Sequence, residues 1–545
     1  MDDAKDEKKF NLLDDSWILV TYTNGKNDTL SLQDTLFRAH EIKALSGELP
    51  TQDAAILRLL LAVLYAVFTR VDETGTELDD EYDAVTLWKR LWDLRRFPKE
   101  VIGSYLDCYR ERFWLIHPER PFWQVVFDKN NPPTNKDGKG YKPTEMPAVR
   151  FIGDIETSGN LFCGRTENYW VELPEAARWL VHLNSFGPAP AGAPGKPPVT
   201  VKKGYGIPWP AKIGMTWISG DDFFETLMLN LVLEHNQKIW EDSPAWWEKE
   251  PPCLTVEDLG RNELPLPKGI VELMSMQYRY VKLQVNNDCV IGFELWSGAW
   301  FDIVQAFTEK MTPWKKNDEG DYIPRRFGTS KQLWRDFTAL MPQSGDASPG
   351  VVKWANRLKR KSATLPFLRI NTIGITYKPM NANVEEIFSD SLSINADMLS
   401  DLGDAWVTRI TGFLTTTEKM VNALGQIALD IAKAIGGSEN LNDKRNAARE
   451  EAYFVLDMPF RNWLVDIDPA IHDLDSTCEI WENTAHRIIL QLGEELVTSA
   501  GVVAFIGRRE GTKSLTASTA HIKFKNTVAK ILRENKAGAE NKVNA

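Results

Sequence analysis

The sequence predicts an α+β protein that is mostly helical, with a large mixed N-terminal domain containing small β-sheet regions and a C-terminal four-helix bundle. Three observations predict this class. The 545 residues exceed the size of one ordinary hydrophobic core. Strand-like runs gather at 271–308 within a mostly helical pattern. Long amphipathic segments with short connectors follow residue 402. We therefore expect a mixed α/β domain over 1–400 and the bundle over 401–545.

The N-terminal domain is expected to open with a strand at 10–22, where apolar and polar residues partly alternate. Its most apolar stretch, 54–68, contains Arg58 and is shorter than the ~20 residues that span a bilayer. We therefore expect a buried core helix there and no membrane segment. The helices expected in this domain lie at 52–70, 82–116, 172–185 and 220–240.

Strand-like runs rich in β-branched and aromatic residues follow in the same domain. The acidic sequence VEEIF at 384–388 is expected to begin a helix, because acidic residues are favourable in a first turn. The expected strands lie at 276–285, 289–296, 300–307 and 365–375.

The bundle is predicted from helical periodicity in four segments, at 402–435, 445–464, 472–499 and 516–535. In the first segment one face is expected to carry Trp406, Ile410, Phe413, Val421, Leu424 and Ile431. In the third segment the expected buried face carries Ile480, Ile488, Leu492 and Leu496.

Composition excludes several classes of protein. The formal net charge is −12, whereas a free-standing DNA-coating protein is usually basic. Any nucleic-acid contact must then come from local basic patches, or from a complex whose other subunits carry the positive charge. Five scattered cysteines without a CxxC pair support neither a zinc ribbon nor a disulfide framework. The charged N-terminus lacks the apolar core of a signal peptide, so we expect a cytoplasmic protein with reduced thiols.

A search for catalytic signatures finds none that holds, because HExxH, GxSxG, Walker A and Rossmann patterns all fail. We therefore expect no catalytic residue, no metal site and no cofactor. A site assembled from distant residues would leave no motif. A metal-independent enzyme, or a scaffold, with a helical-bundle accessory domain therefore stays an alternative.

The first candidate DNA-contacting segment is the Gly/Pro-rich run 186–214. Glycines let a backbone approach a groove or phosphate closely, and the lysines in the run add positive charge beside it. A plain surface linker explains the same composition, so both interpretations stay open. The candidate residues are Gly187, Gly192, Gly195, Lys196, Lys202, Lys203, Gly204 and Gly206, with Lys212 adding further charge.

The second candidate is the strand-like sequence 277–282, in which Arg279 and Lys282 alternate with aromatic residues, a pattern that suits nucleic-acid contact. A half-exposed hairpin is the alternative. The third candidate is the turn at 374–383, which could wedge into a duplex, since inserted side chains offset the cost of unstacking bases. An ordinary loop is the alternative there. The candidate wedge residues are Lys378, Met380, Asn381 and Asn383.

The end of the chain carries a basic cluster, with nine Lys or Arg residues against three Glu over 501–545. Such a cluster indicates either a phosphate-contacting surface or a solvated basic face. The residues that define this basic bundle surface are Arg508, Arg509, Lys513, Lys523, Lys525 and Lys530.

Several motifs follow one another over nearly the whole chain: FNLLDDSWI at 10–18, HPERPFWQ at 117–124, DDFFETLMLNL at 221–231, MTPW at 311–314 with LWRD at 333–336, and the C-terminal bundle. Their order and spacing resemble the CasA family, the large subunit of the type I-E CRISPR Cascade complex.

The resemblance implies a non-catalytic subunit that recognises the protospacer-adjacent motif (PAM) in double-stranded DNA and helps to open the duplex for R-loop formation. It also implies recruitment of the CRISPR helicase-nuclease, and guide RNA and other Cascade subunits as partners. In this division of labour the protein reads a short motif while base pairing reads the sequence.

The resemblance also implies roles for the candidate residues. The family's glycine loop falls within 186–214, its lysine finger corresponds most closely to Lys282 or Arg279, and its wedge turn to 377–383. Asn381 stands where the family has a glutamine. The long loop 128–165 resembles the segment that docks onto RNA and neighbouring subunits, with Phe151 and Phe162 as its expected anchors.

Overall fold

The computed structural model describes most of the chain as two compact units, which are treated separately below. The first unit comprises residues 1–331 and 344–391, and the second comprises 332–343 and 392–545. The described residues are 8–79, 82–127, 144–147, 170–188, 207–250, 253–254, 264–297, 300–328, 331–361, 364–365, 367–378, 384–437, 440–510 and 513–543.

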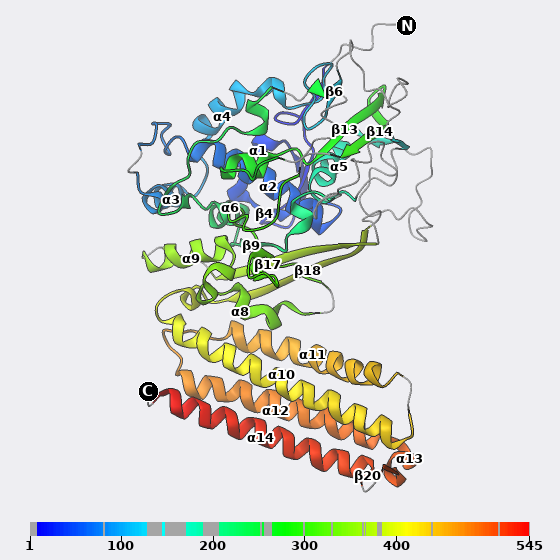
Figure 1. The fold of residues 1–545 in the computed structure, drawn as a ribbon. Coiled ribbons are helices and arrows are strands. Elements are labelled where there is room, and N and C mark those ends of the chain that lie inside the picture. The colour runs from blue at the N-terminus through cyan, green and yellow to red at the C-terminus, as the bar shows by residue number, and fades with distance from the viewer. Residues whose placement is uncertain are drawn as a thin grey trace. The chain divides into compact units, whose positions relative to one another are not determined.

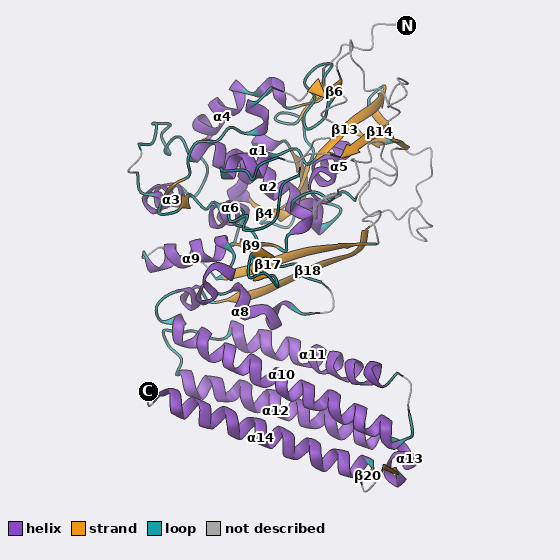
Figure 2. Cartoon of the chain, in the orientation of Figure 1, coloured by secondary structure: helices purple, strands orange, loops and turns teal. Residues whose placement is uncertain are grey.

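The fold class predicted from the sequence is confirmed: the chain is mostly helical, its strands form several small separate sheets, and a helical bundle occupies the C-terminal part (Figure 2). The helices of the first unit are α1 (Leu32–Phe37), α2 (Pro50–Phe68), α3 (Ala84–Asp93), α4 (Lys99–Cys108), α5 (Leu173–Phe186), α6 (Phe223–Asn230), α7 (Ile270–Ser275) and α9 (Gly350–Arg360).

Helix α2 is the core helix of the first unit, as predicted. In the described part of the chain, it is the one helix that is long and apolar enough to cross a membrane. However, 94% of its most apolar stretch is buried within the protein. It packs against α5 and α7. The charge of Arg58, inside this helix, is neutralised by the equally buried Glu309. A nitrogen of the Arg58 guanidinium lies 2.9 Å from a carboxylate oxygen of Glu309.

The strands of the first unit form small sheets, most of them antiparallel. One sheet has the strand order β3 (Asn27–Leu30), β2 (Ile18–Tyr22) and β4 (Ile42–Leu45). A second sheet consists of β13 (Arg279–Asn286) and β14 (Cys289–Ser297) with β7 (Thr144–Pro147) and β8 (Val171–Glu172). A third sheet has the order β18 (Val384–Ile394), β17 (Leu368–Tyr377) and β9 (Met215–Ser219). The two-stranded sheets are β1 (Lys9–Asn11) with β5 (Trp114–Ile116), β6 (Val126–Phe127) with β12 (Cys253–Leu254), β10 (Glu234–His235) with β11 (Lys238–Ile239), and β15 (Trp314–Lys316) with β16 (Tyr322–Pro324).

The second unit is built around four long helices that run alongside one another (Figure 1). Helix α10 contacts the other three, and the six apolar residues expected on its inner face are all buried. The elements are α8 (Phe337–Leu340), α10 (Gly403–Ala434), α11 (Leu441–Val465), α12 (Leu474–Thr498), α13 (Gly501–Ile506), β19 (Arg508–Glu510), β20 (Lys513–Leu515) and α14 (Ala517–Val543).

Two of the expected helices are wrong in extent. The helix expected at 82–116 divides into α3 and α4, because Arg95 adopts a left-handed conformation (φ 55°) and Pro98 cannot continue a helix. The helix expected at 220–240 ends at Asn230. The Asn230 side chain donates to the carbonyl of Ile218 at 2.7 Å and accepts from its N–H at 2.9 Å, which joins the helix end to β9.

Four expectations about strands and faces are also wrong. The strand expected at 10–22 divides into β1 and β2, because residues 12–15 form a turn in which the N–H groups of Asp14 and Asp15 donate to the Asn11 carbonyl. Residues 300–307 form no strand, because Gln305 takes a left-handed conformation (φ 52°). The sequence at 384–388 belongs to strand β18, beside β17, and not to a helix. Ile480 is 60% exposed, and its neighbour Trp481 is buried in its place.

Candidate nucleic-acid interface

Three segments that the sequence singled out meet in the first unit. Helix α5 ends at Phe186, β13 begins at Arg279, and β17 ends at Tyr377. The hydroxyl of Tyr377 donates to the carbonyl of Phe186 at 2.7 Å. The Arg279 guanidinium donates to the carbonyls of Gly187 and Pro188 at 2.7 and 2.9 Å. The start of the Gly/Pro-rich run, the hairpin and the stem of the expected wedge turn are therefore joined at one place.

The end of α5 is set by its own backbone and by Asn184. The Gly187 N–H donates to the Leu183 carbonyl at 3.1 Å, and a Cβ on residue 187 would lie 2.6 Å from that oxygen. Only glycine therefore fits this turn without a shift. The Asn184 side-chain oxygen accepts from the N–H groups of Tyr278 and Arg279 at 2.7 and 3.1 Å. Asn184 was not predicted from the sequence, because no recognisable motif surrounds it.

The two finger candidates on β13 differ in exposure. Arg279 is only 3% exposed, so its guanidinium holds the backbone after α5 and is not presented to solvent. The interpretation of Arg279 as a DNA-contacting finger is at odds with this placement. Lys282 is exposed and lies opposite Glu294 of β14. Of the two candidates, Lys282 is therefore the residue that can reach a partner molecule.

A group of cations lies beside this junction. Lys212, at the end of a short 3-10 helix (Pro210–Lys212), is only 4% exposed. Burial, and then the charges of Arg279 and Arg326, lower the pKa of Lys212 to about 8. The Arg326 side chain donates to the Lys212 carbonyl at 3.0 Å. Sequence reasoning noted Lys212 but missed Arg326, because only the folded chain brings residue 326 to this place.

The strands that flank the expected wedge turn are part of one sheet. Strands β17 and β18 are neighbours, and β17 also pairs with β9 from Arg369–Ser219 to Ile373–Met215. Lys378 follows β17 and is half-buried. Met380, Asn381 and Asn383 lie outside the described residues.

Most of the other predicted residues of the N-terminal domain also fall outside the part of the chain that the structure describes. These are Gly192, Gly195, Lys196, Lys202, Lys203, Gly204 and Gly206 of the expected glycine loop, and Phe151 and Phe162 of the expected docking loop. Gly187 is described and buried, and its observed role is to let the chain leave α5.

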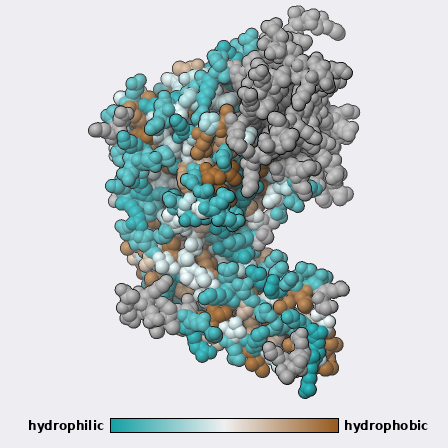
Figure 3. Space-filling model, in the orientation of Figure 1, coloured by the Kyte–Doolittle hydropathy of each residue, from teal (hydrophilic) through white to brown (hydrophobic). Residues whose placement is uncertain are grey.

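The basic bundle surface lies on the second unit, and the described side chains that define it are exposed. Arg508 and Arg509 lie on β19, and Lys513 lies on β20. Three lysines of α14 have acidic partners: Lys523 with Asp430 at 2.8 Å, Lys525 with Glu494 at 3.1 Å and Lys530 with Glu534 at 3.7 Å. The face of this unit drawn in Figure 3 is largely hydrophilic, with hydrophobic residues in smaller groups. Exposed pairs of this kind are weak, so these lysines can exchange their partners for phosphates.

The described residues hold no group of three or more His, Cys, Asp or Glu side chains that could bind a metal ion. His182 is buried in α5, and its Nε2 lies 3.0 Å from the hydroxyl of Thr51. Burial lowers the pKa of His182 to about 4, so its ring is neutral near pH 7. This histidine is a packed core residue.

Comparison with known proteins points to one family. Residues 11–492 match the family model described as CRISPR-associated protein Cse1. A curated relative, CRISPR-associated protein CasA/Cse1 of Thermus thermophilus, is 26% identical over 458 residues, which cover 82% of each chain.

Solved structures show the same fold. Thermobifida fusca Cse1 is 29% identical with a TM-score of 0.78, over 97% of this chain and 99% of that chain. Cse1 from Acidimicrobium ferrooxidans is 23% identical with a TM-score of 0.75, over 98% and 99% of the two chains. A chain of a CRISPR RNA-guided surveillance complex is 18% identical with a TM-score of 0.69, over 98% and 99%.

Proposed function

Because its family model matches residues 11–492, the chain belongs to the CRISPR-associated protein Cse1 (CasA) family, and we propose that it recognises the PAM in double-stranded DNA as the large subunit of a type I-E Cascade complex. In this proposal it helps to separate the duplex for R-loop formation and then recruits the helicase-nuclease. It works in the cytoplasm, and it performs no catalysis of its own.

The observation that carries this proposal is the junction of three candidate segments. Arg279 holds the carbonyls of Gly187 and Pro188, and Tyr377 holds that of Phe186. The Gly/Pro-rich run therefore starts at the place where the stem of the wedge turn ends. One short stretch of duplex could then be contacted by both segments together.

A wedge needs a firm base, and the sheet β18–β17–β9 supplies one. Separating stacked bases costs a few kcal/mol per step, which a loosely held turn could not offset. At Gly374 in β17 a Cβ would lie 2.4 Å from the carbonyl oxygen of Phe327, so the backbones are closely packed there. This packing holds β17 close to the end from which the proposed wedge turn continues.

Of the cations beside the junction, Arg326 is exposed and fits contact with the DNA backbone, whereas Lys212 is buried and adds positive charge behind it. Lys212 and Arg326 gather near residues 187–188, although the chain as a whole carries a net charge of −12. Lysine and arginine side chains supply the sequence-independent part of DNA affinity, while guide RNA supplies the sequence code.

The partners in this proposal are guide RNA, the other Cascade subunits, double-stranded target DNA and the helicase-nuclease. One solved relative in fold is a chain of a CRISPR RNA-guided surveillance complex, which supports assembly with RNA. Phe151 and Phe162 are the proposed anchors for RNA and neighbouring subunits.

The proposal is tested by substituting the wedge. In reconstituted complex, Met380→Ala combined with Asn381→Ala should slow the opening of duplex target but leave binding to a pre-opened target nearly unchanged. Opening is followed by fluorescence of a base analogue beside the PAM, and binding by gel shift. Lys282→Ala is the companion variant, expected to weaken binding to both targets. If the Met380→Ala, Asn381→Ala variant lost duplex opening and binding to the pre-opened target equally, these residues would not act as the wedge.

A further inference from the structure

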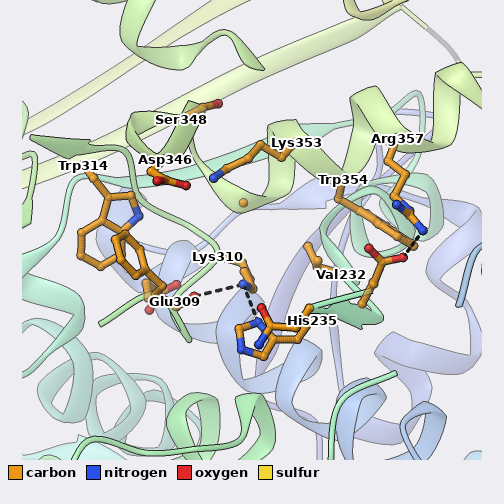
Figure 4. A pocket seen from close by; sticks show the side chains of 14 residues that line it. Val232, His235, Glu309, Lys310, Trp314, Asp346, Ser348, Lys353, Trp354 and Arg357 are labelled. Atoms are coloured by element: carbon orange, nitrogen blue, oxygen red, sulfur yellow. Dashed lines mark hydrogen bonds and ion pairs between the residues drawn. The ribbon is translucent and has the colours of Figure 1, made fainter. Parts of the chain in front are cut away.

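A cavity of about 330 Å³ lies within the first unit, away from the junction of the three candidate segments. It is lined by β10 and the turn after it, by residues between Phe307 and Trp314, and by residues between Asp346 and Arg357, most of them in α9 (Figure 4). Its volume is at the lower end of the range for small-molecule sites.

One wall of the cavity holds Lys310 in a fixed position. Asn236 and Gln237 both have positive φ, so the β10–β11 turn is tight and returns Trp240 onto His235. The rings of His235 and Trp240 are parallel, with centroids 4.3 Å apart. The Lys310 ammonium lies 3.2 Å from His235 Nδ1, donates to the Phe307 carbonyl at 3.0 Å and sits over the Trp240 ring.

The opposite wall is the beginning of α9. A Cβ on Gly350 would lie 3.0 Å from the Lys310 Cα, and the Val351 N–H donates to the Lys310 carbonyl at 3.0 Å. This close approach places Lys353, in the first turn of α9, across the cavity from Lys310. Figure 4 shows the Lys353 side chain extending from α9 above Lys310.

The cavity lining carries three acidic and three basic side chains, and two of the acids belong to ion pairs. Arg357 pairs with Glu234 at 2.7 Å, and Glu309 pairs with Arg58 at 2.9 Å. Asp346 is the third acid of the lining, and its charge acts on Lys353. Within the described residues, neither lysine has a carboxylate within ion-pair distance.

Two further observations concern groups that a bound anion would stabilise. Burial, and then the charge of Lys353, lower the pKa of Lys310 to about 8, and burial also lowers the pKa of Lys353. Trp354, only 2% exposed and part of the cavity wall, has an indole N–H without a hydrogen-bond partner in the described structure. Because Trp354 lines the cavity, a bound ligand is one source of the acceptor that this N–H lacks.

We propose that this cavity binds the phosphate group of a small organic phosphate, held between the ammonium groups of Lys310 and Lys353. Two lysines on opposite walls suit a multiply charged tetrahedral anion, since lysine binds phosphate as a point charge and not through a planar fork. The rings of Phe307 and Trp314 offer apolar surface to the rest of a ligand of about nucleotide size. This site is independent of the proposed reading of DNA.

The test is calorimetric titration of the full chain at pH 7 with adenosine 5′-monophosphate, inorganic phosphate and adenosine. The nucleotide should bind saturably, inorganic phosphate should compete with it, and adenosine should not bind. Lys353→Gln should weaken nucleotide binding by about tenfold or more, the typical effect of losing one charge-assisted hydrogen bond. Lys359→Gln, which removes the same charge from α9 outside the cavity lining, should bind as the unaltered chain does.

A second readout is proton uptake. A bound phosphate favours the charged lysines, so titrations at pH 8 in buffers of different ionisation enthalpy should show protons taken up on binding, with less uptake in Lys353→Gln. Oligonucleotides with and without a 5′-phosphate identify the source. Tighter binding of the phosphorylated strand than of the nucleotide assigns a nucleic-acid end, and the reverse assigns a free nucleotide. The proposal is overturned if no phosphate probe binds, if adenosine binds equally, or if Lys353→Gln has no effect.

Discussion

The guanidinium of Arg279 donates a hydrogen bond to the carbonyl oxygen of Gly187 at 2.7 Å, across 92 residues of sequence. This bond joins the first residue of β13 to the residue at which the chain leaves α5. Both residues are buried, so no water replaces the bond if the guanidinium is removed. The contact makes Arg279 a positioning residue for the segment that follows Gly187.

Arg279→Ala should destabilise the first unit, because it leaves the buried Gly187 carbonyl and its neighbour without a donor. An unsatisfied buried group of this kind costs about 1–3 kcal/mol. Urea denaturation should show the loss, and hydrogen exchange should show faster opening of the last turn of α5. Lys282→Ala, on the same strand but exposed, should change stability by less than about 0.5 kcal/mol. Equal effects of the two substitutions would contradict the positioning role.

The sequence predicted what depends on local periodicity. The inner face of α10, from Trp406 to Ile431, follows from a helical repeat that needs no knowledge of the partner helices. The same reasoning failed at Ile480, where the face of α12 is turned so that Trp481 packs inside. It also failed at 384–388, where an acidic run typical of a helix start forms a strand because β17 lies beside it.

The candidate site depends on contacts that no local pattern contains. The sequence indicated Arg279 as a candidate DNA-contacting residue, but the carbonyls that it binds lie 92 and 91 residues away. Asn184 and Arg326 carry no motif, yet they orient the start of β13 and add charge beside Lys212. Sequence reasoning therefore found the segments but not the side chains that join them.

His182 should make the first unit less stable in acid. Its folded pKa is lowered from 6.5 to about 4, so its contribution is fully present above pH 6.5 and is lost as pH falls toward 4, where the unfolded chain binds the proton first. The shift corresponds to about 3 kcal/mol at most. His182→Gln should flatten the pH dependence of unfolding between these values. His472→Gln, at an exposed position, should leave the slope unchanged, and a slope equally steep in both variants would exclude His182 as its source.

The basic bundle surface can be tested for phosphate contact without disturbing the bundle. Lys523→Gln with Lys525→Gln should alter stability by less than about 1 kcal/mol, because both pairs are exposed. The logarithm of DNA affinity decreases linearly with the logarithm of salt concentration. If both lysines contact phosphates, this negative slope should become shallower by about 2 in the double variant. Lys444→Gln, exposed on α11, is the matched control. An unchanged slope in the double variant would favour a surface used for protein contacts alone.

Trp334 should anchor residues 332–343 within the second unit. Its ring stacks on Phe460 with centroids 4.8 Å apart and meets Tyr453 and Trp481 edge-on at 6.1 and 6.5 Å. Trp334→Ala should cost the bundle about 3–5 kcal/mol, the usual effect of removing a large core side chain.

Two further variants separate packing from hydrogen bonding at this position. The Trp334 indole N–H is buried without a partner in the described structure, so Trp334→Phe removes an unsatisfied donor while keeping most of the ring contact. It should therefore cost clearly less than Trp334→Ala. Phe454→Ala, at a 76% exposed position of α11, should cost less than about 0.5 kcal/mol. Thermal unfolding followed by circular dichroism orders the three variants, and a Trp334→Ala protein as stable as Phe454→Ala would show that residues 332–343 are not held through this ring.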